Sequence, residues 1–170
     1  MRIKWFSLIR ITGLLLVLLY HFFQTIFPGG FFGVDVFFTF SGFLITSLLL
    51  EEFGKARQID LLGFFKRRFY RIVPPVVLMV LVTMPFTFLV RQDYVAGIGG
   101  QIAGVLGFMT NFYEMLTGGS YESQFIPHLF VHNWSLAVEV HYYILWGLAV
   151  WFLSKRSKSS SQLRGMVFLL

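Results

Sequence analysis

Residues 7–27, with the sequence SLIRITGLLLVLLYHFFQTIF, are almost entirely apolar yet contain Arg10 and His21. A helix needs roughly 20 predominantly apolar residues to cross a bilayer, and this run supplies them. An ionisable side chain inside a membrane costs at least ~2.5 kcal/mol by insertion scales. A chain keeps such a group where it pairs, lines a cavity or takes part in chemistry. The run therefore predicts a membrane-spanning helix that carries functional residues.

The composition supports a membrane protein over the whole chain. Of the 170 residues, 56% are hydrophobic and 13% are charged. A soluble domain has roughly 45–50% apolar and about 25% charged residues. The net charge of +6 comes from basic residues clustered at the ends of apolar runs, which is the positive-inside pattern. We therefore expect an integral membrane protein whose partner is the lipid bilayer, and we expect no nucleic acid as a partner.

Four segments are long and apolar enough to cross the membrane. They are residues 7–27, 31–50, 74–90 and 134–153. Residues 51–73, between the second and third segments, are rich in Lys and Arg. The positive-inside rule predicts a cytoplasmic basic loop there and a cytoplasmic N-terminus. Residues 113–133 are then predicted to form an extracytoplasmic loop.

Segment 97–112 decides how often the chain crosses. If it spanned the membrane, the basic residues after 153 would lie outside, against the positive-inside rule. Its glycines also disfavour a lipid-facing helix. We therefore expect an interfacial or re-entrant element on the outer side. The predicted fold is an all-α, polytopic transmembrane helical bundle with about four spanning helices, this element, and the start of a further helix at the C-terminus.

Three ionisable groups are expected at one depth in the outer half of the membrane. His21 lies eleven positions after Arg10, so it faces the same way and lies roughly 16 Å further along the helix axis. Asp35 is near the outer start of the second span, and Glu139 is about one turn into the last span. A histidine oriented by a carboxylate is the usual arrangement of a general base. The alternatives are a packed His21 bonded to a carbonyl group and an Asp35 that caps its helix.

Basic residues on the inner side suggest phosphate recognition. Arg68 and Arg71 lie one turn apart, next to Arg67. The forked guanidinium group suits phosphate oxygens, although an ordinary positive-inside anchor would have the same charges. No metal site is expected, since the chain has no cysteine and the His128 and His132 pair lacks a third ligand.

These residues fall within four motifs that resemble the acyltransferase 3 family, which consists of multi-pass bacterial membrane O-acyltransferases. The motifs are Arg10 with His21, residues 33–45 (GVDVFFTFSGFLI), residues 67–74 (RRFYRIVP) and residues 132–139 (HNWSLAVE). They occur in the order found in the family. Within it, the chain is most similar to peptidoglycan O-acetyltransferases of Gram-positive bacteria.

The resemblance implies a transfer reaction across the bacterial cytoplasmic membrane. An acetyl group would move from cytoplasmic acetyl-CoA to a hydroxyl of an extracytoplasmic cell-envelope glycan, peptidoglycan being the expected acceptor. The implied catalytic residues are His21, Glu139 and Asp35. The implied acetyl-CoA-binding residues are Arg10, Arg67, Arg68 and Arg71. Lesser roles in acyl relay or substrate contact are implied for Ser135, Trp134, His132 and Tyr142.

Other interpretations of the sequence stay open. Intramembrane histidine and carboxylates also suit a proton-coupled transporter or flippase subunit. Members of the family have about ten helices, so residues 1–170 are expected to be the N-terminal part of a single membrane acyltransferase domain. A truncated, inactive fragment of such an enzyme is the third interpretation.

Overall fold

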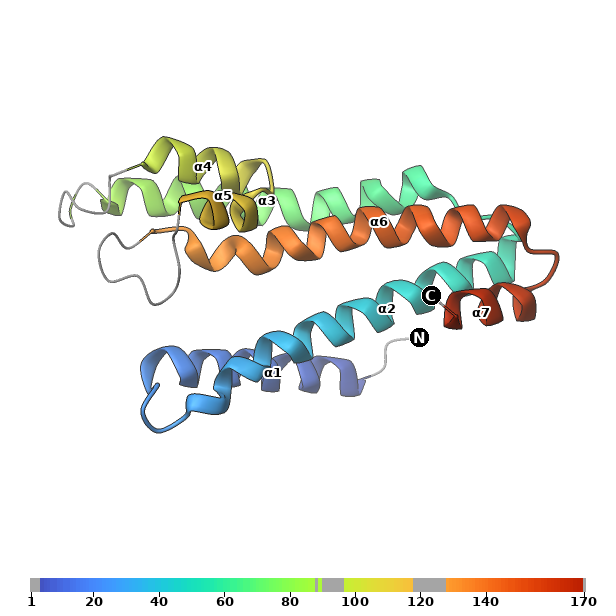
Figure 1. Ribbon diagram of the computed structural model, residues 1–170, viewed down its shortest axis with the longest axis horizontal. Helices are drawn as coiled ribbons and strands as arrows, with labels where there is room; N and C mark the ends of the chain where they lie inside the picture. The colour runs from blue at the N-terminus through green and yellow to red at the C-terminus, as the bar shows by residue number, and fades with distance from the viewer. Residues whose placement is uncertain (1–3, 88, 90–96, 118–127, 170) are drawn as a thin grey trace. The chain divides into compact units, whose positions relative to one another are not determined.

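The computed structural model describes residues 4–87, 89, 97–117 and 128–169 (Figure 1). These residues form helices joined by turns, as the sequence predicts. In chain order the elements are α1 (Lys4–Phe22), η1 (Pro28–Phe31), α2 (Phe32–Ala56), α3 (Leu61–Thr87), α4 (Ile98–Leu106), α5 (Thr110–Thr117), η3 (Val131–Asn133), α6 (Trp134–Arg156) and α7 (Ser160–Phe168). They divide into two compact units, Met1–Arg57 with Ser157–Leu170 and Gln58–Arg156, each of which is described by itself.

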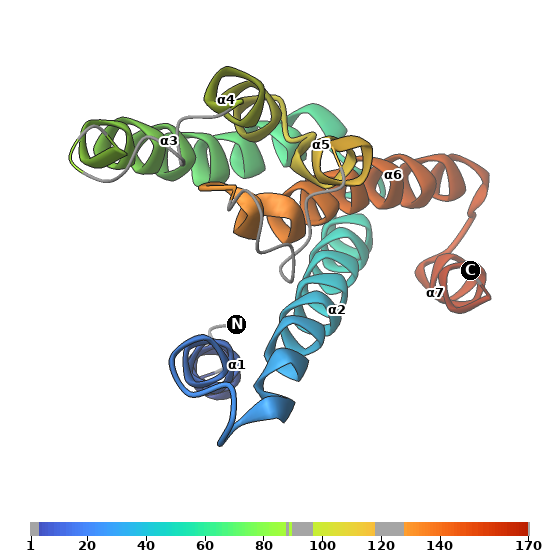
Figure 2. The ribbon, with the colours of Figure 1, turned by 60° about the vertical axis from the view of Figure 1, so that its left-hand side comes forward.

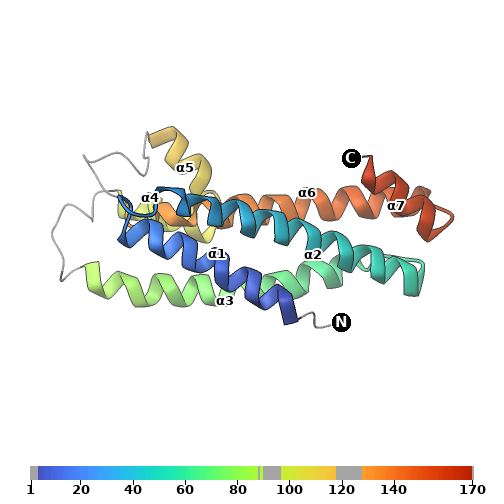
Figure 3. The same cartoon turned by 90° about the horizontal axis from the view of Figure 1, so that it is seen from below.

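Helices α1 and α2 of the first unit lie side by side (Figure 3). They meet at Gly13 and Gly33. A Cβ atom on Gly33 would lie 2.5 Å from the Gly13 carbonyl oxygen and 2.8 Å from Val17 Cγ2. Small residues at this crossing let the two backbones approach closely, which is how membrane helices gain packing energy. Helix α7 packs against α2 in the same unit.

The second unit is built on the long helices α3 and α6. Helix α4 contacts α3, and α5 contacts α6 (Figure 2). Four buried side chains form its core, with Val76 and Val80 on α3, Val105 on α4 and Phe130 just before η3. Helix α4 is therefore held against α3 by apolar contacts.

Three helical segments in the described part of the chain are long and apolar enough to cross a membrane. They are Pro28–Ala56, Leu61–Thr87 and Val131–Arg156, and Ile11–Phe22 is a shorter apolar helix. The predicted membrane helical bundle is thus confirmed. Helix α1 ends at Phe22, before the predicted limit at residue 27.

The third spanning helix begins thirteen residues before the predicted position. Helix α3 starts at Leu61, so Pro74 lies inside the helix and not in its first turn. The start is set by Asp60, whose Oδ1 accepts a hydrogen bond from the Gly63 backbone N–H at 2.9 Å, as in an N-terminal cap. Phe64 is buried near Gly147 of α6, which stabilises the helix upstream of its prolines.

Residues 51–73, expected to be a loop, are therefore mostly helical. Helix α2 continues to Ala56 and α3 begins at Leu61. The break between them starts at Arg57, which has a left-handed backbone with φ 55°. Its cytoplasmic location stays a prediction.

Segment 97–112 contains no spanning helix, as predicted. It holds α4, of 9 residues, and the start of α5, of 8 residues, and neither is long enough to cross a bilayer. The chain bends at Phe108, whose φ is 54°. Of the predicted outer loop 113–133, residues 113–117 belong to α5 and 118–127 lie outside the described residues. The further helix at the C-terminus is α7.

Candidate functional site

His21 lies at the end of α1 and its ring is oriented by the backbone. Its Nδ1 donates a hydrogen bond to the Val17 carbonyl oxygen at 2.8 Å. Because a carbonyl oxygen can only accept, Nδ1 carries the proton, and Nε2 is the basic nitrogen of the neutral ring. The carbonyl bond matches the packing alternative, and the ring meets that of Tyr20 edge-on with ring centres 5.5 Å apart, but the side chain is exposed.

Asp35 lies in the first turn of α2, at the same end of the helix pair as His21. Its side chain is exposed. Within the described residues it forms no hydrogen bond or ion pair, either with His21 or as a cap of α2. The close contact of Gly33 with α1 nevertheless fixes the backbone two residues before Asp35.

Glu139 faces a polar cavity between α3 and α6 of the second unit. The cavity has a volume of about 230 Å³. Its lining residues are Arg68, Arg71, Ile72, Pro75, Val76, Leu136, Glu139 and Tyr143. The Tyr143 hydroxyl donates a hydrogen bond to Glu139 Oε1. The Arg68 guanidinium lies 5.4 Å from the centre of the Tyr143 ring and 5.6 Å from that of Phe64.

The cavity brings together two motifs that the sequence analysis placed at different depths. Arg68 and Arg71 were expected on the inner side and Glu139 in the outer half of the membrane. Because α3 begins at Leu61, both arginines lie well inside a 27-residue helix. Their long side chains then border the same cavity as Glu139. His21 lies in the other unit, so its pairing with Glu139 stays a prediction.

A second, larger cavity adjoins the arginines. It has a volume of about 790 Å³ and shares Arg68, Ile72 and Tyr143 with the polar cavity. Its other lining residues are Leu62, Phe65, Lys66, Phe69, Val73, Phe108, Val140 and Ile144. The walls are thus apolar apart from two cationic side chains and one phenol, which suits a flexible apolar arm that ends in an anion.

The remaining predicted residues have simpler surroundings. Arg10 lies on α1, and Arg67 is exposed on α3. Trp134 and Ser135 begin α6, and the Ser135 hydroxyl donates to the carbonyl oxygen of His132 at 3.3 Å. The Tyr142 ring stacks on Trp146, with ring centres 5.7 Å apart.

The sequence analysis missed one pair of polar residues. His128 Nδ1 lies 2.6 Å from Glu114 Oε2. A signal was present, because Glu114 is the only charged residue between Tyr94 and Tyr121. The described residues contain no group of three or more side chains that could hold a metal ion.

Comparison with known proteins gives one consistent result. The acyltransferase domain family matches residues 3–170. The O-acetyltransferase OatA of Staphylococcus aureus strain NCTC 8325 / PS 47 is 34% identical over 150 residues, which cover 88% of this chain and 25% of that protein. The O-acetyltransferase OatA of strain COL gives the same values. The chain thus spans about a quarter of the length of these relatives. No solved structure matches it.

Proposed function

Since the chain belongs to the acyltransferase domain family, we propose that it carries the donor-binding part of a membrane O-acetyltransferase. The donor is cytoplasmic acetyl-CoA, and the acceptor is a hydroxyl of an extracytoplasmic cell-envelope glycan, peptidoglycan in the first instance. The observation that carries the proposal is the cavity that Arg68 and Arg71 share with Glu139. It combines two guanidinium groups, which suit phosphate oxygens, with a carboxylate between two long apolar helices.

The two adjoining cavities together supply cationic groups and room for the donor. Phosphate groups of acetyl-CoA pair with the guanidinium groups of Arg68 and Arg71, which offer forked donors. The pantetheine arm lies in the larger cavity, where Lys66, Arg68 and Tyr143 are the polar side chains available to its amide and hydroxyl groups. Arg68 borders both cavities, so it would be in contact with the donor in either one.

The transfer chemistry is assigned to His21. With Nδ1 bonded to the Val17 carbonyl, the ring presents a basic Nε2. Nε2 attacks the thioester carbonyl carbon, the carbon–sulfur bond breaks, and CoA leaves as a thiolate that takes a proton. The acceptor hydroxyl then attacks the same carbonyl carbon, loses its proton to a base and releases the imidazole. Glu139 or Asp35 would stabilise the charged imidazole.

Alkali-releasable acetate on purified cell-wall peptidoglycan tests the proposal. The strains to compare are one that lacks the gene, the same strain complemented with the wild type, and one complemented with His21→Ala. Acetate that is lost on deletion and restored only by the wild type supports the proposal. Wall acetate that is unchanged in all three strains would contradict peptidoglycan as the acceptor.

A further inference from the structure

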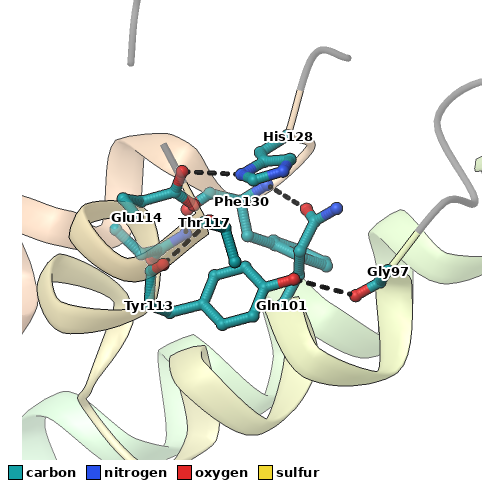
Figure 4. A network of polar contacts seen from close by, with 8 residues as sticks. Gly97, Gln101, Tyr113, Glu114, Thr117, His128 and Phe130 are labelled. Atoms are coloured by element: carbon teal, nitrogen blue, oxygen red, sulfur yellow. Dashed lines mark hydrogen bonds and ion pairs between the residues drawn. The ribbon is translucent and has the colours of Figure 1, made fainter. Parts of the chain in front are cut away.

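A buried acid–base pair lies between α5 and the segment that leads into η3 (Figure 4). His128 Nδ1 is 2.6 Å from Glu114 Oε2. The side chains of His128 and Glu114 are 12% and 8% exposed respectively, so both are largely buried. An ionised carboxylate has no proton to donate, so His128 Nδ1 is the donor in this hydrogen bond. Nε2 is then the basic nitrogen of the neutral ring.

The surrounding contacts hold the imidazole in place. Gln101 is 1% exposed, and its Oε1 accepts a hydrogen bond from the Phe130 backbone N–H at 3.4 Å. This bond fixes the segment that carries His128 to α4. The Tyr113 ring lies 5.7 Å from the His128 ring, and its hydroxyl donates to the Gly97 carbonyl oxygen at 3.4 Å (Figure 4).

A purely structural role explains this pair poorly. A buried ion pair is worth little to stability unless the remaining polar atoms are also satisfied. Glu114 Oε1 and Thr110 Oγ1 are buried and have no hydrogen-bond partner among the described residues. The carboxylate thus directs its one hydrogen bond at the imidazole. A buried carboxylate bonded to Nδ1 is the arrangement that stabilises an imidazolium when Nε2 takes up a proton.

We propose that His128 is the general base for the acceptor hydroxyl and that Glu114 is its positioning residue. This inference rests on the proposed function. Nε2 takes the hydroxyl proton while the hydroxyl oxygen forms the new ester bond with the acetyl carbonyl carbon. The bond between that carbon and the atom that delivered the acetyl group breaks, and its electron pair stays on that atom. The His128 imidazolium then loses its proton to water, which restores the neutral imidazole.

The other titratable groups near the pair are few in the described part of the chain. Tyr113 on α5 faces the imidazole. On the α6 side of α5, the His141 ring lies 5.5 Å from Phe112. His132 is exposed in η3. Helix α4 contributes the uncharged Gln101.

The test uses membranes that contain the protein at the length that the cell makes. It measures the transfer of acetate from acetyl-CoA to de-O-acetylated peptidoglycan strands. His128→Gln is expected to lower the transfer rate by about 10²–10⁴-fold, the usual contribution of a general base. Imidazole in the buffer should partly restore transfer by His128→Ala. Glu114→Gln keeps an acceptor for Nδ1 but loses the charge, so it should lower the rate and change the pH profile.

Thr117→Ala on the same helix is the matched control, because Thr117 is exposed and its hydroxyl bonds only the Tyr113 carbonyl. It should transfer at the wild-type rate. Full transfer by His128→Gln would overturn the inference and leave the proposed function standing. The inference would also be overturned if His128→Ala lost transfer, kept the thermal stability of the wild type and was not rescued by imidazole. No transfer by the wild type would instead overturn the proposed function on which the inference rests.

Discussion

Tyr143 lies one turn after Glu139 on α6, and its hydroxyl donates a hydrogen bond to Glu139 Oε1. The face of the same ring carries the Arg68 guanidinium, 5.4 Å from the ring centre. A tyrosine can make both contacts because its ring attracts a cation and its hydroxyl is a hydrogen-bond donor. Tyr143 thus connects the glutamate of one motif with an arginine of another.

Tyr143→Phe should separate these two contacts. The variant keeps the ring beneath Arg68 and loses the hydrogen bond to Glu139. A hydrogen bond to a charged group is worth about 1.5–3 kcal/mol, so we expect transfer to fall by about ten-fold or more. Tyr143→Leu should lose more, since it also removes the ring. The measurement is the initial rate of acetate transfer in membranes, and a Phe variant as active as the wild type would contradict a role for the bond.

Arg68 and Arg71 should respond differently to replacement by lysine. Lysine keeps the charge but loses the forked donors and the stacking on aromatic rings. Arg68 is half-buried against Phe64 and Tyr143, whereas Arg71 is exposed. We therefore expect Arg68→Lys to raise the KM for acetyl-CoA and to lower the thermal stability, and Arg71→Lys to raise the KM alone.

Arg57→Lys is the control for the arginine variants. Arg57 is exposed in the break between α2 and α3 and does not line either cavity. Its replacement should change neither the KM nor the stability. An unchanged KM in Arg68→Lys and Arg71→Lys would argue against phosphate binding at the polar cavity.

The sequence predicts the long helices well because their signal is local. An apolar run of sufficient length must either cross the membrane or be buried, so α2, α6 and the non-spanning segment 97–112 follow from the residues themselves. The start of α3 depends on Asp60, whose carboxylate caps the helix at Gly63, and on the packing of Phe64 near Gly147. The basic residues around Asp60 favoured a loop in the sequence analysis, because a local sequence pattern does not reveal which side chains pack together in the fold.

The candidate site, like the fold, could be predicted only in part. The motif residues were recognisable one by one, but the cavity that joins Arg68 with Glu139 depends on how far α3 extends. The pair of Glu114 and His128 joins residues fourteen positions apart, which no local pattern connects. Polar pairs of this kind can therefore be recognised only in the three-dimensional structure.

The orientation of the chain can be tested with single cysteines. The chain contains no cysteine, so each introduced thiol is the only one in these residues. Gln24 follows α1 and Arg57 follows α2, and both are exposed. We expect a membrane-impermeant maleimide added outside intact cells to label Gln24→Cys and to label Arg57→Cys only after the membrane is opened. The reverse pattern would place the N-terminus outside.

Gly33→Ala should destabilise the pair of α1 and α2. The added Cβ would lie 2.5 Å from the Gly13 carbonyl oxygen and 2.8 Å from Val17 Cγ2, so the helices must move apart. Overpacking of this kind costs about 1–3 kcal/mol.

Gly54→Ala on the same helix is the matched control, because nothing lies within 4 Å of its added Cβ. Alanine inside a helix is favoured over glycine by roughly 0.5–1 kcal/mol, so this variant should be slightly more stable than the wild type. Thermal unfolding in detergent micelles compares the two. Opposite changes in Tm are expected, and a Gly33→Ala variant as stable as Gly54→Ala would contradict the close approach of α1 and α2. Since Gly33 also sets the backbone next to Asp35, transfer activity in Gly33→Ala should fall together with the Tm.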